Sequence, residues 1–294
     1  MNFQRLLSCL WLPFRGYRRV AHSFAHFMEK SASFKTPLGV QLPSSFRSLL
    51  KRNLDTVDVH KDCRCFIFGN GPSLGKLDLT LFQDDITIGV NGFYKHTQAR
   101  TCQPSYYCLS PDFFFDGSAV ARSFLSELLA TIEKSCFYIP LIGQAKNIVR
   151  DGCLPLERTF FIPHNGSLVH DDIEKVDFLH SVPNGVNIIQ EALLMAFHVG
   201  CNPIYLLGVE HDWLATRTGN THFYSDFARH PTFRYLDQWS YYERIRGALQ
   251  TWECYLTINR YALKHGIRIV NLTPNSFLDV FESGDLSAFM KKVV

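Results

Sequence analysis

The sequence has no long apolar run, no repeat and no low-complexity segment. A membrane-spanning helix needs about 20 apolar residues in succession, and no stretch of the 294 residues provides them. The apolar run at residues 6–12 is short and includes Ser8 and Cys9. No small-residue cleavage site follows it before Arg15, so a signal peptide is not predicted. We therefore expect a globular, cytoplasmic protein.

Cysteine pairs with the spacing of metal ligands are also missing. The nine cysteines are odd in number and scattered through mostly apolar segments. Cys63 and Cys65 are separated by one residue instead of two, and no second pair follows at the spacing of a zinc site. This pattern argues against a disulfide framework and predicts reduced cysteines in the core, with no bound metal.

Acidic residues are nearly absent from residues 1–52, which hold nine Lys or Arg and one Glu, a net charge of +8. The rest of the chain holds 21 Lys or Arg and 26 Asp or Glu, a net charge of −5. A basic segment joined to a slightly acidic body indicates an anionic partner. No nucleic-acid-binding motif accompanies the basic residues, so a nucleic-acid partner is not expected.

The basic segment also has an apolar stripe. Five apolar side chains near the N-terminus recur at helical spacing: Phe3, Leu6, Leu7, Leu10 and Trp11. Basic amphipathic helices of this kind are typical of proteins that lie on a membrane surface. We predict that residues 1–61 form an arm that contacts an anionic membrane; a helix packed on the body is the alternative.

A short apolar run followed by glycines lies at residues 65–74, CFIFGNGPSL. Glycines permit backbone conformations closed to other residues and let a ligand approach the main chain, and Ser73 stands where a helix would be capped. A helix start with free amides favours an anion. We predict a phosphate or nucleotide loop; a tight turn without a ligand is the alternative. The loop consists of Gly69, Asn70, Gly71, Pro72 and Ser73.

Strand-like and helix-like segments alternate along the rest of the chain. Strands are predicted at residues 65–68, 86–90, 105–109, 136–139, 160–162, 203–207 and 267–272, and helices at 118–134, 186–200 and 241–265. This alternation predicts an α/β domain over residues 62–294, with an open, mostly parallel Rossmann-like sheet and helices on both faces.

Polar residues and glycines accumulate at the ends of these strands and before the second helix. Open α/β sheets bind ligands beyond the carboxyl ends of their strands, so we expect these residues to line a nucleotide site. They are Asn91, Ser110, Asn184, Gly185, Gly208, Glu210 and His211.

Residues 214–240 form a long polar and aromatic stretch without a clear period. Irregular segments of this length in compact domains are typical of functional lids. The stretch contains His222, Tyr224 and His230, which we treat as candidate site residues.

Five motifs occur in the order seen in the bacterial sialyltransferases of glycosyltransferase family 42. They are GNGPSL at residues 69–74, Asn91, Ser110-Pro111, the block at residues 184–210, and TPNS at residues 273–276. Over roughly residues 62–280 the chain resembles these enzymes. It also resembles the flagellin glycosyltransferases of the motility-associated-factor type and the group related to the archaeal 6-hydroxymethylpterin diphosphokinase. The resemblance implies a Rossmann-like variant of the GT-A fold.

The resemblance further implies a metal-independent enzyme that needs no cofactor and binds a sugar activated by cytidine monophosphate (CMP). Carried over by position, three loop residues would contact phosphate and ribose, and Asn91 would contact the nucleotide. Asn184, Gly185 and Gly208 would line the other side of the nucleotide site. The three loop residues are Asn70, Gly71 and Ser73.

The chain departs from the family pattern in three places. Ser110 stands where the family has Asn, and His211-Asp212-Trp213 replaces an aromatic pair. The position of the family's catalytic histidine falls at Ala248 or Leu249. The catalytic role must therefore have moved, or the reaction differs.

Transfer of a sugar to a hydroxyl group needs a base, and histidine suits that role near neutral pH. We expect His222 to be the base, because Thr221 and Tyr224 could complete a polar cluster over the phosphate. His211 is the second candidate and His230 the third.

Three functions stay open. The predicted one is a glycosyltransferase, peripheral on the inner face of the cytoplasmic membrane, that acts on a surface glycan or glycolipid and could form homo-oligomers. The second is an ATP- and magnesium-dependent pterin-type diphosphokinase, with Glu210, His211 and Asp212 around the cation. The third, favoured by the missing family histidine, is an inactive nucleotide-binding subunit.

Overall fold

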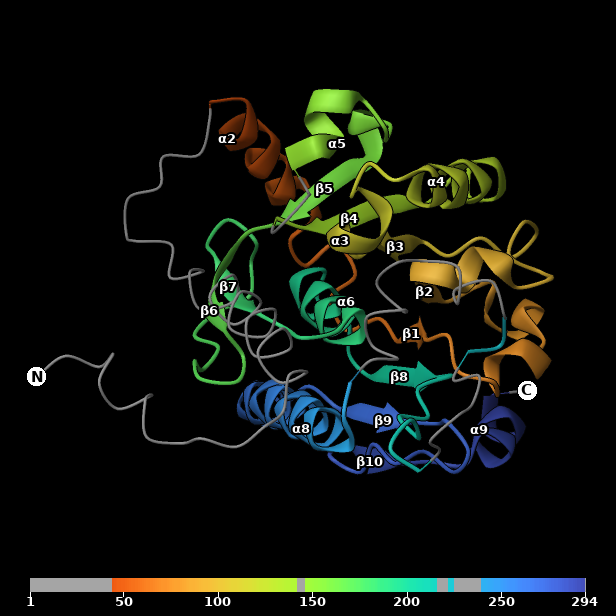
Figure 1. Ribbon diagram of the computed structural model, residues 1–294. Coiled ribbons are helices and arrows are strands. Elements are labelled where there is room, and N and C mark those ends of the chain that lie inside the picture. Colours follow the sequence, from red (N-terminus) through yellow and green to blue (C-terminus); the bar gives the residue numbers. More distant parts are fainter. Residues whose placement is uncertain (1–43, 142–145, 216–221, 225–238, 294) are drawn as a thin grey trace, which may run out of the picture. The chain divides into compact units, whose positions relative to one another are not determined.

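The computed structural model describes residues 44–141, 146–215, 222–224 and 239–293 (Figure 1). The chain divides after Gln41, and all described residues belong to the second unit, Leu42–Val294. The predicted amphipathic stripe, most of the predicted lid and His230 lie outside the described residues.

An eight-stranded sheet forms the centre of the fold, in the order β10-β9-β8-β1-β2-β3-β4-β5. Every neighbouring pair is parallel, which confirms the predicted open α/β sheet. The strands are β1 (Cys65–Phe68), β2 (Ile86–Val90), β3 (Tyr106–Cys108), β4 (Cys136–Pro140), β5 (Thr159–Ile162), β8 (Ile204–Leu207), β9 (Ile269–Asn271) and β10 (Glu282–Ser283).

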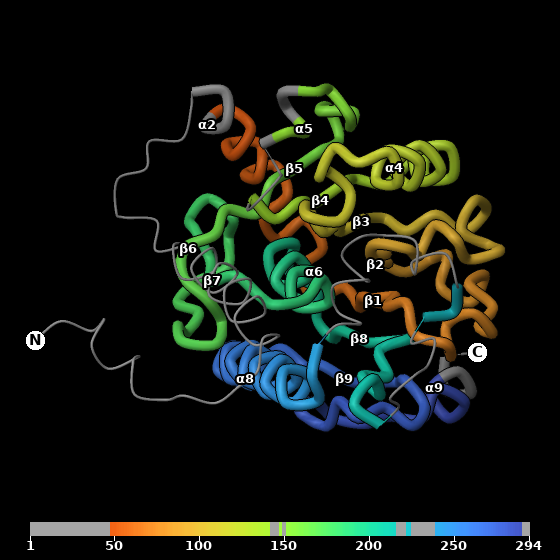
Figure 2. The backbone as a smooth tube through the Cα atoms, viewed as in Figure 1, coloured from red at the N-terminus to blue at the C-terminus, as the bar shows by residue number. Residues whose placement is uncertain are grey.

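The order of the strands reverses at β1. From β1 the chain adds strands toward β5 on one side, and the later strands β8 to β10 extend the sheet on the other side (Figure 2). At such a reversal the connections leave in opposite directions, so a crevice opens beyond the carboxyl ends of the two central strands. In this chain those strands are β1 and β8.

Both faces of the sheet are covered. Along β1, Cys65 and Ile67 belong to one buried cluster and Phe66 and Phe68 to the other, as expected for a strand buried on both sides. Helices α6 (Ile188–His198) and α8 (Tyr241–Lys264) contribute to the first cluster. Helices α4 (Ala119–Thr131) and α9 (Leu286–Val293) contribute to the second.

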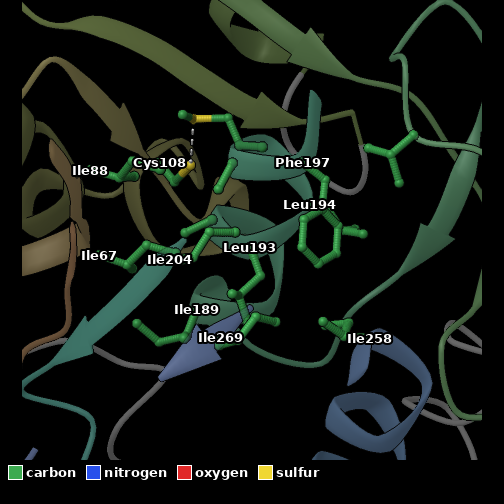
Figure 3. Close-up of a cluster of buried hydrophobic side chains, with 14 of the residues drawn as sticks. Ile67, Ile88, Cys108, Ile189, Leu193, Leu194, Phe197, Ile204, Ile258 and Ile269 are labelled. Atoms are coloured by element: carbon green, nitrogen blue, oxygen red, sulfur yellow. Dashed lines mark hydrogen bonds between the residues drawn. The ribbon is translucent and has the colours of Figure 1, made fainter. Parts of the chain in front are cut away.

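Helix α6 is the central helix of the first cluster and contacts β1, β2 and β3. In Figure 3 its side chains Leu193, Leu194 and Phe197 lie among residues from the strands. Every residue from Ile189 to His198 is buried, so α6 is a core helix, which needs no polar face. Its start is marked by a capping box of Asn187 and Gln190.

The remaining elements are short, and several were not predicted. A second, two-stranded parallel sheet pairs β6 (His164–Ser167) with β7 (Val182–Asn184). Its strand β6 has the polar sequence HNGS, which carries no strand signal. The other elements are helices α2 (Ser44–Lys51), α3 (Pro111–Phe114) and α5 (Lys146–Asp151), and 3-10 turns η2 (Arg52–Thr56), η3 (Leu74–Lys76), η4 (Leu79–Phe82), η5 (Asn91–Lys95) and η7 (Leu156–Arg158).

No helix in the described residues is long and apolar enough to cross a membrane. The cysteines of the described part are free thiols, and five of them are buried: Cys65, Cys102, Cys108, Cys201 and Cys254.

Residues 44–61, which the sequence assigns to the arm, contact the α/β body. The buried Asn53 donates from Nδ2 to the carbonyl oxygens of Phe161 and Phe178, at 2.9 Å each. The Asp58 amide donates to the His198 carbonyl at 3.0 Å. Residues 44–61 are therefore attached by hydrogen bonds to β5 and to the end of α6.

Asn53→Ala should lower the free energy of unfolding by about 1–3 kcal/mol, because two buried carbonyl groups would lose their donor. Urea unfolding of the two proteins measures the difference. Asp55→Ala, two residues away with an exposed side chain, is the matched control and should change the free energy little. Equal effects of the two substitutions would contradict the role of Asn53.

Candidate ligand site

A pocket of about 310 Å³ lies beyond the carboxyl ends of β1, β2, β3 and β8, where the strand order reverses. Small-molecule sites commonly have volumes of roughly 300–1,000 Å³ and occur at this place in open α/β sheets. Eight of the predicted site residues line it: Asn70, Gly71, Asn91, Ser110, Gly208, Glu210, His211 and His222.

Six predicted residues do not line the pocket, namely Gly69, Pro72, Ser73, Asn184, Gly185 and Tyr224. Sequence reasoning did not select several residues that do line it, among them Asn187, Asp212 and Trp213. Asn187 could have been found, because an Asn three residues before Gln190 at the start of an apolar run is a capping signal.

The loop after β1 runs beside the loop after β8. The Gly69 amide donates to the Leu207 carbonyl at 2.7 Å, and the Gly71 amide donates to the Gly208 carbonyl at 2.9 Å. A Cβ atom on Gly69 would overlap the Gly208 carbonyl, so only glycine allows this approach. Both amides are therefore engaged within the protein.

A carboxylate lies where the loop was predicted to hold an anion. The Ser73 amide donates to Oε1 of Glu210 at 2.7 Å, and a Cβ atom on Gly71 would overlap the same carboxylate. Oε2 of Glu210 is buried and has no hydrogen-bond partner among the described residues. The Glu210 side chain therefore occupies the position predicted for the ligand anion and holds the loop through the Ser73 amide.

The helix predicted to begin at Ser73 is not formed. Ser73 has helical torsion angles and makes no side-chain cap, and the three-residue turn η3 follows it. Phe223 lies against this turn, since its Cβ atom would be 2.9 Å from a Cβ atom built on Gly75. A single short turn has no aligned run of peptide dipoles to attract an anion.

Asparagine side chains join the loops after β1, β2 and β3. Nδ2 of Asn70 donates to the Val90 carbonyl at 3.2 Å, and Oδ1 of Asn91 accepts from the Ser110 amide at 2.9 Å. Asn91 has a φ of 41°, a left-handed conformation that Asn tolerates better than most residues. Oδ1 of Asn70 is buried without a partner among the described residues, which is rare for a buried polar atom.

Residues 222–224 of the predicted lid lie beside these loops. The Phe223 amide donates to the Asn70 carbonyl at 3.0 Å, and the Tyr224 hydroxyl lies against Gly92, where a Cβ atom would overlap it. Burial raises the pKa of Tyr224 and lowers the pKa of His222 to about 4. His222 is therefore neutral at pH 7.

His211 is held by a residue that sequence reasoning missed. Its Nε2 lies 2.8 Å from the hydroxyl oxygen of Tyr255 on α8, and Tyr255 donates to Oδ1 of Asn187 at 3.3 Å. Burial lowers the pKa of His211 to about 4, so its ring is also neutral at pH 7. Tyr255 lies 44 residues away and follows the apolar period of α8, so its sequence pattern indicates only a core position.

Asn184 belongs to β7, where it pairs with Ser167 of β6, and Gly185 contacts a buried pair of side chains, His164 and Glu191. The Gly185 amide donates to Oε1 of Glu191 at 2.8 Å, and Oε2 of Glu191 lies 3.1 Å from Nε2 of His164. The side chains of His164 and Glu191 are only 3% and 4% exposed. These residues therefore connect the β6–β7 sheet with α6 and do not line the pocket.

Two of the three residues proposed as cation ligands, Glu210 and His211, contact different parts of the protein. Glu210 reaches the Ser73 amide, and His211 reaches Tyr255. Within the described residues, no group of three His, Cys, Asp or Glu side chains could hold a metal ion. The described residues that line the pocket include two carboxylates, Glu210 and Asp212, and no Lys or Arg.

Comparison with known proteins gives no relative: no protein-family model, no curated protein and no solved structure matches the chain.

Gly71→Ala should lower the free energy of unfolding by about 1–3 kcal/mol, because the added methyl group displaces the Glu210 carboxylate and leaves the Ser73 amide without its charged partner. In a Glu210→Ala background the same substitution should cost much less. Thermal or urea unfolding of the double-mutant cycle measures this coupling.

Gly69→Ala is the control for this cycle. Its methyl group would meet the Gly208 backbone, which does not depend on Glu210. Its cost should therefore be the same in both backgrounds. A cost of Gly71→Ala that is equally independent of Glu210 would show that the carboxylate does not occupy the loop.

Proposed function

We propose that the chain is a glycosyltransferase that moves a nonulosonate, a sialic-acid-like sugar, from a CMP-activated donor to a hydroxyl group of a surface glycan or glycolipid, without a metal ion. The observation that carries the proposal is the pocket at the reversal of the strand order, lined by strand-end Asn, Ser and Glu residues together with two neutral histidines. The order of the five motifs supports the sugar and the nucleotide.

The polar groups of the pocket suit a nucleoside. Oδ1 of Asn70 and Oε2 of Glu210 are acceptors without donors among the described residues. Both atoms are buried, so a ligand donor would reach them only if the groups that cover them move; it would then satisfy acceptors that otherwise destabilise the protein. The ribose hydroxyl groups and the amino group of cytosine are such donors.

The start of α6 suits the phosphate. Ile188 and Ile189, the first two residues of the helix, line the pocket. An eleven-residue helix has a partial positive charge at its N-terminus. The amides of Ile189 and Gln190 already donate to Asn187, so the helix would act on the phosphate mainly through its dipole.

One observation favours a second function, an ATP- and magnesium-dependent diphosphokinase of the pterin type. The described residues of the pocket include two carboxylates and no Lys or Arg. Carboxylates bind Mg²⁺ together with the phosphates of a nucleotide. This reading requires Glu210 to leave the Ser73 amide and to turn toward Asp212.

A thermal-shift panel of CMP, CDP, UDP, GDP and ATP, each with and without Mg²⁺, separates these functions. We expect CMP without Mg²⁺ to raise the melting temperature most. At 100 times its dissociation constant a ligand adds about 2.7 kcal/mol to the stability, which corresponds to roughly 5–10 °C in a domain of this size.

Asn70→Ala should weaken CMP binding by about 1–3 kcal/mol, because a buried partner of the ligand is lost. Asn259→Ala is the matched control, since Asn259 also donates to a backbone carbonyl, that of Val280, but does not line the pocket. Selective stabilisation by ATP with Mg²⁺ would favour the diphosphokinase. Stabilisation by none of the nucleotides would contradict both enzymes.

We also propose that the basic N-terminal segment attaches the protein to the inner face of the cytoplasmic membrane. The support is its net charge of +8 and its apolar stripe, both read from the sequence. This attachment would bring the pocket to a membrane-bound acceptor.

Replacement of Arg15, Arg18 and Arg19 by Gln should weaken binding to vesicles that contain phosphatidylserine, by about 1 kcal/mol for each charge removed. Co-sedimentation measures the binding, and vesicles of neutral phosphatidylcholine are the control. Deletion of residues 1–30 should abolish the binding and leave the CMP-induced thermal shift intact. Vesicle binding that persists after the deletion would contradict the proposal.

A further inference from the structure

His211 combines an unusual backbone with a fixed side chain. It follows β8 at the rim of the pocket and has a φ of 52°, in the left-handed region. A non-glycine residue in that region costs free energy and persists only when surrounding contacts stabilise it, and such residues cluster at functional sites. Here the contacts come from α8, through the rings of Trp252 and Tyr255 at 5.7 and 5.4 Å.

The hydroxyl hydrogen of Tyr255 has two neighbouring acceptors, Nε2 of His211 at 2.8 Å and Oδ1 of Asn187 at 3.3 Å. When Tyr255 donates to Asn187, its oxygen accepts from His211, Nε2 of His211 carries the hydrogen and Nδ1 keeps the free lone pair. The proposal below requires this arrangement. Nδ1 of His211 makes no hydrogen bond with the described residues, and part of its surface is accessible.

Asn187 anchors this chain of hydrogen bonds to the protein core. Its Oδ1 also accepts from the amides of Ile189 and Gln190, at 3.0 and 3.2 Å, as the cap of α6. In the arrangement that the proposal requires, donation runs from His211 through Tyr255 to Asn187. Protonation of Nδ1 would leave this direction unchanged, so the ring can accept a proton without rearrangement of its partners.

We propose that His211 is the base of the reaction, with Tyr255 and Asn187 as positioning residues. This inference depends on the proposed function. The acceptor hydroxyl oxygen forms a bond to the anomeric carbon of the sugar while the bond from that carbon to the phosphate oxygen breaks. CMP leaves with the electron pair, and the hydroxyl proton moves to Nδ1 of His211. The proton then passes to solvent, which restores the neutral ring.

This assignment differs from the expectation that His222 is the base. His222 also lines the pocket. The described contacts of His211, however, fix its ring orientation, and donation from Tyr255 to Asn187 would also define its tautomer. A base with one defined lone pair at the pocket meets the geometric requirement for proton transfer.

The tautomer can be measured directly on the full chain labelled with ¹⁵N-histidine. Long-range ¹H–¹⁵N spectra at pH 7 should show His211 with a protonated Nε2 and a bare Nδ1, and the signal is assigned by its absence in His211→Asn. Tyr255→Phe should shift His211 to a mixture of tautomers. A His211 protonated on Nδ1 in the wild-type chain would overturn the proposal.

Activity is measured as release of CMP from CMP-N-acetylneuraminate, with water or lactose as the hydroxyl acceptor. His211→Asn should lower the rate about 10²- to 10⁴-fold with CMP affinity unchanged. Asn tolerates the left-handed backbone, so this variant removes the base without strain. Tyr255→Phe should lower kcat by about 10- to 100-fold, the range for loss of a residue that orients a functional histidine.

Tyr106→Phe is the matched control. The Tyr106 hydroxyl lies 2.7 Å from Nε2 of His60, and this similar pair lies at the opposite end of the sheet. The Tyr106→Phe substitution should leave the rate unchanged. Wild-type CMP release that persists in His211→Asn would overturn the role of His211 and leave the proposed function standing. CMP binding without CMP release by the wild-type chain would overturn the proposed transferase and the role of His211 with it.

Discussion

The pairing between β1 and β8 continues past the last residue of each strand, and the candidate site depends on it. The amides of Gly69 and Gly71 donate to the carbonyls of Leu207 and Gly208, so two loops far apart in the sequence lie side by side. Glycine is required at Gly69, since any Cβ atom would overlap the opposite backbone. Because the strand order reverses between these two strands, the ends of both open onto the pocket.

The same contact gives Glu210 its position. A glycine-rich loop after a first strand is familiar as a place where backbone amides hold a phosphate. Here one amide of the loop, that of Ser73, donates to a carboxylate of the chain itself, and Gly71 leaves space for it. The two uses need the same residues, because a carboxylate and a phosphate are both anions that accept from amides. A glycine motif therefore indicates an anion without saying whether it belongs to a ligand.

Helices α6 and α8 bring a second set of polar groups to the pocket. Asn187 ends the loop before α6 and begins the helix, and Tyr255 reaches it from the buried face of α8. His211 completes the set from the end of β8. Behind α6, the buried pair of His164 and Glu191 holds the preceding loop through the Gly185 amide. The hydrogen bond from the Gly185 amide to Glu191 ties the loop before α6 to the helix itself.

The alternation of apolar runs and glycine or asparagine turns was sufficient to predict seven of the eight strands of the main sheet, their parallel arrangement and the three main helices, because burial on both faces leaves a continuous apolar signal. The eighth strand, β10, is two exposed polar residues and was not predicted. It also predicted that the pocket would contain Asn70, Asn91 and Glu210, since the strand ends of an open sheet meet at one edge. The small β6–β7 sheet escaped prediction because its strand β6 is polar.

The amino-acid sequence by itself determined the periodic burial of the core, the reversal of charge between the N-terminal segment and the body, and the kinds of polar side chain at the strand ends. Only the tertiary structure decided what those side chains contact. Glu210 turned toward the Ser73 amide, and His211 turned toward Tyr255, 44 residues further along the chain. The physical reason is that hydrogen-bond partners are selected by distance in space, which a local sequence pattern does not contain, whereas burial follows the local period of the backbone.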